Sequence, residues 1–320
     1  MEAEHTKPIY NDEDAARAHL EGLLWPHGPV CPSCGVVDDA VKMAGESHRK
    51  GLYNCRSCRT PFTVTVGTVF ESSHIPLHKW VYGMHLMAAS KKGISALQLQ
   101  RQLGLGSYRT AWFMAHRIRE ALRPTDTTPI GGEGQIVEAD ETYYGKLDSQ
   151  KGQKPEPYVR GKHTNKKNVR PIVALVERGG QVRVFHVGNA DKATVTQILV
   201  ENVHHESRLH TDESRLYTGA EHHFLTHETV KHSAKEYARW DVNTNSAEGF
   251  FGVFKKGMVG VYQHCSEKHL SRYVDEFAFR HNTRAKLGFN DQDRAALAIQ
   301  GAAGKRLTYR RAGVSQAAYA

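Results

Sequence analysis

Apolar residues recur at helical spacing between residues 77 and 122. The segment LHKWVYGMHLMAAS, residues 77–90, places them along one helical face. The segment ISALQLQRQLGLGSYRTAWFMAHRIREAL, residues 94–122, has Ser95 and Ser107 at positions typical of helix N-caps, with a Gly-Leu-Gly turn between them. This pattern predicts a helix-turn-helix, although a short helical hairpin in any bundle has a similar pattern.

A different pattern follows residue 134. QIVEADETYYG predicts a strand that ends in acids at Asp140, and VRPIVALVERGGQVRVFHVGNA predicts two strands joined at a Gly-Gly turn. DKATVTQILVENV predicts a helix beginning at Asp191, and SRLHTDESRLY predicts a short strand running into Asp212. Strand, hairpin, helix, strand and helix in this order predict an α/β domain, with an RNase H-like mixed sheet flanked by helices.

The last element of that series is an amphipathic segment, NTNSAEGFFGVFKKG, residues 243–257. It predicts a helix with a phenylalanine-rich face and one acid, Glu248. A solvent-facing glutamate on such a helix needs no function, so its meaning depends on the other acids of the domain.

Four of the five cysteines form two C-x2-C pairs with twenty residues between the pairs: Cys31, Cys34, Cys55 and Cys58. This spacing lets two knuckles present four thiolates to one tetrahedral Zn²⁺. Disulfides and a redox-active pair are the alternatives. A reducing compartment disfavours disulfides, and redox chemistry needs only one pair. The alternating residues around the second pair predict a zinc ribbon.

Composition narrows the class of protein. The chain has 320 residues, 39% of them hydrophobic, and a net charge of +9, which favours a polyanionic partner. No segment approaches the roughly 20 apolar residues of a membrane span, and the acidic N-terminal sequence is unlike a secretory signal. We therefore expect a cytoplasmic protein with no membrane partner.

Asp140, Asp212 and Glu248 form an ordered set of acids on the predicted sheet and the helix that follows it. Three carboxylates brought together in this way can hold two divalent metals about 4 Å apart, a geometry suited to phosphodiester chemistry. Mg²⁺ or Mn²⁺ suits such oxygen ligands. Lys255, seven residues after Glu248, lies near the same helical face and is a candidate contact for a backbone phosphate. Taken singly, Asp140 and Asp212 also fit solvated acids at strand ends.

These motifs resemble a known family, the bacterial insertion-sequence transposases that join an N-terminal zinc ribbon to a DDE-type catalytic domain. The resemblance rests on LWPHGPVCPSCG, VEADETYYG, TDESRLY, GKRLTYR and the stretch from residue 243 to 284. It implies cut-and-join chemistry on the element's own terminal inverted repeats, with Asp140, Asp212 and Glu248 as catalytic acids and Lys255 as the basic residue after them. Some relatives have asparagine as the third residue, and Asn245 lies one turn before Glu248. Carboxylate affinity for magnesium and the spacing to Lys255 favour Glu248.

The expected partner is double-stranded DNA, both the element ends and the target, bound by a homodimer or higher assembly in a nucleoid-associated protein. The second helix of the helix-turn-helix and a basic segment at 146–170 supply most candidate contacts. The candidate DNA-binding residues are Tyr108, Arg109, Arg117, Lys166, Lys167 and Lys256.

The expected organisation has six parts. They are an N-terminal helical segment (1–27), a zinc ribbon (28–72), a helix-turn-helix (73–123), a linker (124–134), an RNase H-like catalytic domain (135–290) and a basic flexible tail (291–320). Two other functions compete with a transposase: a non-catalytic DNA-binding regulator, and a nuclease that stops after hydrolysis. A regulator has no need of the full acid set.

Overall fold

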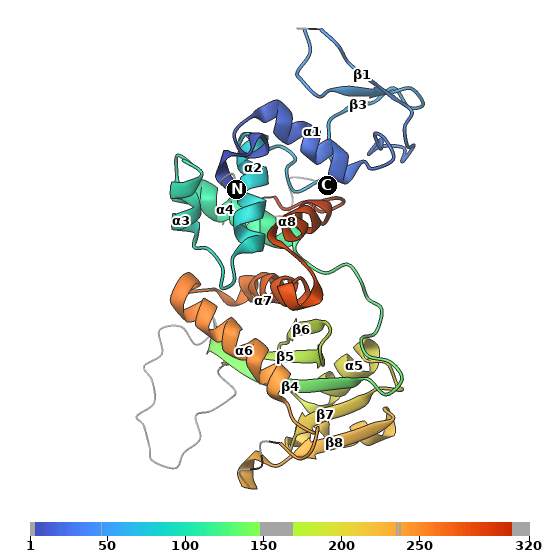
Figure 1. Cartoon of the computed structure of the whole chain (residues 1–320), viewed down its shortest axis with the longest axis vertical. Helices are drawn as coiled ribbons and strands as arrows, with labels where there is room; N and C mark the ends of the chain where they lie inside the picture. Colours follow the sequence, from blue (N-terminus) through green and yellow to red (C-terminus); the bar gives the residue numbers. More distant parts are fainter. Residues whose placement is uncertain (1–3, 46, 148–168, 235, 237, 309–320) are drawn as a thin grey trace, which may run out of the picture. The chain divides into compact units, whose positions relative to one another are not determined.

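The computed structural model describes residues 4–45, 47–147, 169–234, 236 and 238–308 (Figure 1). It divides into two compact units, each described here by itself. Unit 1 comprises residues 1–90, 94–123 and 289–320, and unit 2 comprises residues 91–93 and 124–288, within those described ranges. Across the described part of the chain, the helices are all too short or too polar to cross a membrane.

Unit 1 contains a small antiparallel sheet in the order β1-β2-β3. Its strands are β1 (Ala40–Lys42), β2 (Tyr53–Cys55) and β3 (Pro61–Phe62). Tyr53 and Phe62 are buried together with two of the cysteines, and Trp25 packs against them. The short strands predicted around the second cysteine pair are confirmed.

The rest of unit 1 is helical, with short 3₁₀ turns near the start of the chain. The helices are α1 (Glu13–Leu24), α2 (Leu77–Ala89), α3 (Ala96–Gln102), α4 (Tyr108–Ala121) and α8 (Asp291–Gln300). The Ser95 hydroxyl accepts a hydrogen bond from the Gln98 amide, and the Ser107 hydroxyl accepts one from the Thr110 amide. Both predicted N-caps are therefore present, because each hydroxyl satisfies an amide in the first turn of its helix.

Helix α8 corrects one expectation. The sequence predicts a flexible tail from residue 291, but residues 291–300 form a helix that begins with an Asn290–Asp293 capping box. Ala298 and Ile299 are fully buried, so this segment belongs to the core of unit 1. Residues 309–320 lie outside the described part of the chain.

Unit 2 is built on a five-stranded mixed sheet in the order β6-β5-β4-β7-β8. The strands are β4 (Ile136–Lys146), β5 (Val169–Glu177), β6 (Val182–His186), β7 (Arg208–Asp212) and β8 (Thr226–Val230). β4 pairs antiparallel with β5 and parallel with β7, and β8 extends the sheet in parallel beside β7. The mixed sheet agrees with the RNase H-like prediction, while the edge strand β8 was not expected.

Helices cover both faces of this sheet (Figure 1). They are α5 (Lys192–Asn202), α6 (Asn245–Gly257) and α7 (Glu267–Asn282), and a short π-helical turn (Met258–Tyr262) follows α6. Phe250, Phe251 and Phe254 of α6 pack with α7 over one face of β5. Val195 and Leu199 of α5 pack over the opposite face. The face under α6 is the one that carries the acids.

Candidate active site and metal centre

Asp140 and Asp212 lie on neighbouring strands and on the same face of the sheet. β4 and β7 pair in parallel with Glu138 opposite His210, and continuing this register by two residues brings Asp140 opposite Asp212. Asp140 is paired directly with Ala174, a member of the core cluster under α6. Directly paired residues share a face, so both aspartates point towards the α6 side.

One detail of the expectation about Asp140 is wrong. The sequence predicts that the strand ends at this residue, but β4 continues to Lys146 because its second half remains paired with β5. What ends near Asp140 is the pairing between β4 and β7, which stops at Glu138. Asp140 therefore sits where the two parallel strands diverge.

Glu248 approaches from above the sheet, in the first turn of α6. The neighbouring Ala247 is fully buried in the core, while Glu248 itself is exposed. The Thr244 hydroxyl, which precedes the helix, donates to Glu248 Oε1 at 3.3 Å. The buried phenylalanine face of α6 thus fixes the side of the helix on which this carboxylate lies.

The electrostatics of Asp140 indicate that these acids act on one another. The pKa of Asp140 is raised from 3.8 to about 7, mainly by burial and also by the negative charges of Glu141, Asp212 and Glu248. The Glu141 amide, which donates to Asp140 Oδ1 at 2.8 Å, opposes this rise only in part. A bound cation would relieve this repulsion between the acids.

The three acids are spread more widely than the ligands of a single ion. Among the described residues, only the four cysteines form a group of three or more potential ligands whose donor atoms all lie within 4.8 Å of one another. Two Mg²⁺ ions about 4 Å apart need ligands over a wider region than one ion does. The wider spacing of the acids is compatible with a two-metal site.

Asn245, the alternative third residue, is also exposed in the first turn of α6. It lies three residues before Glu248, and residues at this spacing are neighbours on a helix surface. The choice of Glu248 over Asn245 stays a prediction. Lys255 and Lys256 are exposed in the last turn of the same helix.

Glu138 is a residue of this site that the sequence analysis missed. Its side chain is fully buried, and it accepts hydrogen bonds from Arg178 and from the first turn of α6 at Ser246 and Ala247. Glu141 has a similar fixed partner, since the Tyr217 hydroxyl donates to its Oε2 at 2.9 Å. The sequence signal for Glu138 was an acid between two apolar strand residues.

The first turn of α4 presents two of the predicted DNA contacts. Tyr108 is 54% exposed and Arg109 is also exposed. Arg117 differs, because it is only 6% exposed.

The surroundings of Arg117 contradict its predicted role on DNA. Its guanidinium stacks on Trp80 and Phe113 and donates to the Glu71 carbonyl oxygen. Arg117 therefore holds unit 1 together instead of facing solvent. Lys166 and Lys167 lie outside the described residues.

The four cysteines converge as the sequence predicts. Cys31 Sγ lies 3.6 Å from Cys58 Sγ, and Cys34 Sγ lies 3.6 Å from Cys55 Sγ. A disulfide needs sulfur atoms about 2.05 Å apart, whereas thiolates about 2.3 Å from a tetrahedral Zn²⁺ are separated by about 3.8 Å. None of the five cysteines is in a disulfide. The donor set and spacing fit one structural Zn²⁺.

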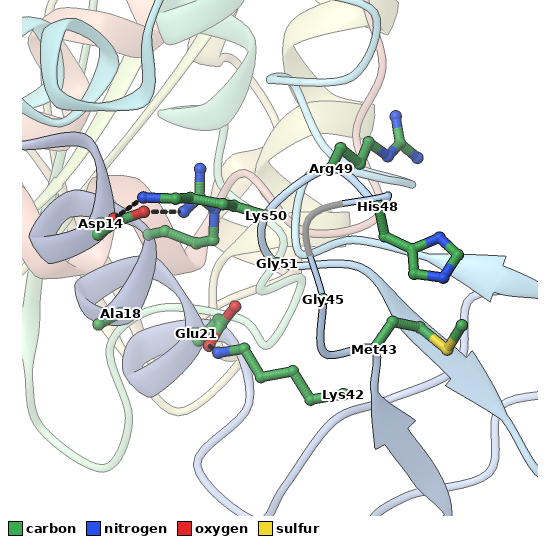
Figure 2. Close-up of a pocket in the computed structure, with 11 residues that line it drawn as sticks. Asp14, Ala18, Glu21, Lys42, Met43, Gly45, His48, Arg49, Lys50 and Gly51 are labelled. Atoms are coloured by element: carbon green, nitrogen blue, oxygen red, sulfur yellow. Dashed lines mark hydrogen bonds and ion pairs between the residues drawn. The ribbon is translucent and has the colours of Figure 1, made fainter.

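Helix α1 and the ribbon enclose a hollow of about 310 Å³ within unit 1 (Figure 2). Asp14 of α1 pairs with Lys50 at 2.6 Å, and Glu21 pairs with Lys42 at 3.4 Å and accepts the Tyr53 hydroxyl at 3.0 Å. These bonds connect the predicted N-terminal segment to the ribbon, so α1 and the ribbon act as one module.

Comparison with known proteins also groups α1 with the ribbon and separates both from the domain that carries the acids. Residues 11–61 match a transposase zinc-ribbon domain, and residues 131–282 match an ISXO2-like transposase domain. The first match includes α1 as well as the cysteines, and the second includes all three acids. A protein of Halobacterium salinarum described as an uncharacterized protein in transposable element ISH50 is 27% identical over 276 residues, covering 84% of this chain and 90% of the relative.

Proposed function

Because the chain belongs to the insertion-sequence transposases that join a zinc ribbon to an ISXO2-like domain, we propose that it cleaves DNA at the terminal inverted repeats of its element and joins the ends to target DNA. The observation that carries this proposal is the group of acids around Asp140, whose pKa is raised to about 7 first by burial and then by Glu141, Asp212 and Glu248. Shifts of this size mark candidate functional sites.

Asp140, Asp212 and Glu248 are the residues that would hold two divalent ions, Mg²⁺ or Mn²⁺. When bound, such a pair supplies Lewis-acid stabilisation of the charge that builds up on a phosphodiester. Asp140 must ionise to serve as a ligand, and a nearby divalent cation lowers its pKa by direct attraction. Metal binding and deprotonation of Asp140 are therefore coupled.

In the proposed reaction, water attacks a phosphorus atom at the element end, and the bond between that phosphorus and O3′ breaks. The released 3′-hydroxyl then attacks a target phosphodiester, with another O3′ as leaving group. Lys255 lies two helical turns from Glu248, about 10 Å along the axis, which suits a contact with a neighbouring phosphate. Lys256 extends this basic end of α6.

Recognition of the DNA ends is assigned to unit 1. The exposed Tyr108 and Arg109 at the start of α4 suit contacts in a major groove, since the N-terminal residues of a recognition helix reach base edges. Lys166 and Lys167 of the basic segment would add contacts that do not depend on sequence. Two or more copies acting on paired ends would form the active assembly.

The test uses purified protein, labelled DNA carrying the flanking repeats, and Mg²⁺. Wild-type protein should give cleaved and joined products. Alanine at Asp140, Asp212 or Glu248 should each reduce cleavage by several orders of magnitude while end binding persists, because each removes ligand charge where negative charge develops. A second acid substitution should add little, as residues acting as a unit are not additive.

Two further variants sharpen the assignment. Asn245→Ala should have a smaller effect than Glu248→Ala, and the reverse order would make Asn245 the third ligand. Lys255→Ala should weaken substrate positioning and leave Mn²⁺ binding unchanged. Specific binding without cleavage in wild-type protein would indicate a regulator, and cleavage without joining would indicate a nuclease.

A further inference from the structure

Glu138 is an acid that the proposed reaction does not use, although it lies on the same face of β4 as Asp140. Its side chain is fully buried. Burying a carboxylate is costly unless its oxygens are hydrogen-bonded. The groups that donate hydrogen bonds to Glu138 therefore indicate its role.

One set of partners is the N-terminus of α6. Glu138 Oε2 accepts the backbone amides of Ser246 at 2.6 Å and Ala247 at 3.1 Å, and Oε1 accepts the Ser246 hydroxyl at 3.0 Å. Helix N-termini have amides without intrahelical partners and a positive dipole end, and a carboxylate satisfies both. Glu138 thus fastens the start of α6 to β4.

The other partner is Arg178, which follows β5. Its Nε and Nη2 donate to Glu138 Oε1 at 2.9 and 2.7 Å. The same guanidinium donates to the carbonyl oxygens of Asp241 at 2.7 Å and Asn243 at 3.2 Å. Arg178 therefore fixes the chain that enters α6, while Glu138 fixes the first turn.

The two residues on either side of this connection are proposed metal ligands. Asp140 is two residues after Glu138 on the same strand face, and Glu248 directly follows Ala247. We propose that Glu138 is a positioning residue that sets the Glu248 carboxylate at the right distance from Asp140 and Asp212. This inference rests on the proposed function, because it assumes that Glu248 binds metal.

Glu138→Gln is the informative change. One carboxylate oxygen accepts from Arg178 and the Ser246 hydroxyl, and the other accepts from two backbone amides. A glutamine in either orientation turns its NH₂ group towards donors, so one end of the connection must break. The variant keeps the size of the side chain.

Glu276→Gln is the matched control. Glu276 is also fully buried in unit 2 and accepts hydrogen bonds from Arg280 and the Tyr262 hydroxyl. It lies on α7, and these two partners, Arg280 and Tyr262, lie outside the first turn of α6. Both variants weaken a buried ion pair, but only Glu138→Gln releases the start of α6.

The experiment measures Mn²⁺ binding to full-length protein without DNA, the Mn²⁺ concentration for half-maximal cleavage, and the thermal midpoint. Substituting a residue that orients metal ligands typically weakens metal binding by 10- to 100-fold. Glu138→Gln should weaken Mn²⁺ binding and raise the half-maximal concentration by about tenfold or more. Glu276→Gln should lower the thermal midpoint and leave both metal readouts at the wild-type value.

Unchanged Mn²⁺ binding in folded Glu138→Gln would overturn the inference. If that variant does not fold, Ser246→Ala decides, since it removes one bond to Glu138 and keeps the charge. It should shift both metal readouts in the same direction by a smaller factor, and no shift would refute the positioning role. Failure of the proposed function would give a different result. Wild-type protein would not cleave DNA, and Asp140→Ala would bind Mn²⁺ as wild type does.

Discussion

Replacing Asp140 with asparagine should stabilise the metal-free protein at neutral and alkaline pH. The folded pKa is about 7 against an ordinary value of 3.8, a difference of about three units, raised first by burial and then by three neighbouring acids. At 1.36 kcal/mol per unit, keeping this carboxyl ionised in the folded state costs about 4 kcal/mol. Asparagine has the same shape, and its Oδ1 still accepts the Glu141 amide.

The direction follows from proton counting. Between about pH 4 and pH 7 the folded state keeps the Asp140 proton and the unfolded state has lost it, so stability falls as pH rises. The stability that the raised pKa of Asp140 contributes is fully present below pH 3.8 and is lost above about pH 7. The unfolding free energy of Asp140→Asn minus that of wild type should therefore rise from pH 4 to pH 8, by about 4 kcal/mol in total.

The assay is urea unfolding without added Mg²⁺ or Mn²⁺, read by hydrogen exchange of peptides from β4 and β5. This readout follows unit 2 by itself, which matters because a two-unit chain need not unfold in one step. Asp241→Asn is the control, since its hydrogen bond to Arg208 lowers the pKa of Asp241, so its stability difference should change only below about pH 4 and stay flat between pH 4 and pH 8. A difference for Asp140→Asn that stays flat between pH 4 and pH 8 would refute the reasoning.

Further variants test the other parts of the chain. Purified protein should contain about one Zn²⁺ per chain by elemental analysis, and Cys34→Ser should lose the metal and unfold the ribbon; a folded ribbon without metal would contradict this. Arg117→Gln should destabilise unit 1 by about 1–3 kcal/mol in thermal unfolding. Arg109→Ala should instead reduce discrimination between element ends and random DNA by about 1–3 kcal/mol in binding assays. Replacing Lys166 and Lys167 with glutamine should reduce the slope of log affinity against log salt by about two.

Much of the fold could be predicted from local sequence patterns. Ser95 and Ser107 were identifiable as caps because capping depends on residues within one helical turn. The zinc site could be predicted from the cysteine spacing for a similar reason, since each C-x2-C pair lies within four residues of the chain. Helix α8 was missed although Asn290 and Asp293 form a local capping box, because its buried stripe of two alanines and an isoleucine gives a weak apolar pattern.

Arg117 could have been placed correctly from helical periodicity alone. It lies three residues after Met114 and one before Ile118, and both are buried in unit 1. A basic residue on the apolar stripe of a helix covers hydrophobic surface with its stem and needs a fixed partner for its head. We predicted that Arg117 contacts DNA because of its positive charge, whereas its position on the helix indicates burial.

Glu138 and Asp140 show why the roles of two acids on one strand face could not be separated by sequence. Alternation predicts that both point to the same side, but their roles depend on partners distant in the sequence, which for Glu138 lie 40 residues away at Arg178 and 109 residues away at Ala247. Glu138 is satisfied by Arg178 and by the amides of α6, so a cation there would compete with bonds already made. Asp140 has one amide donor and three negative neighbours, so a cation relieves repulsion. The difference in partners supports the proposal that Glu138 holds the helix and Asp140 binds metal.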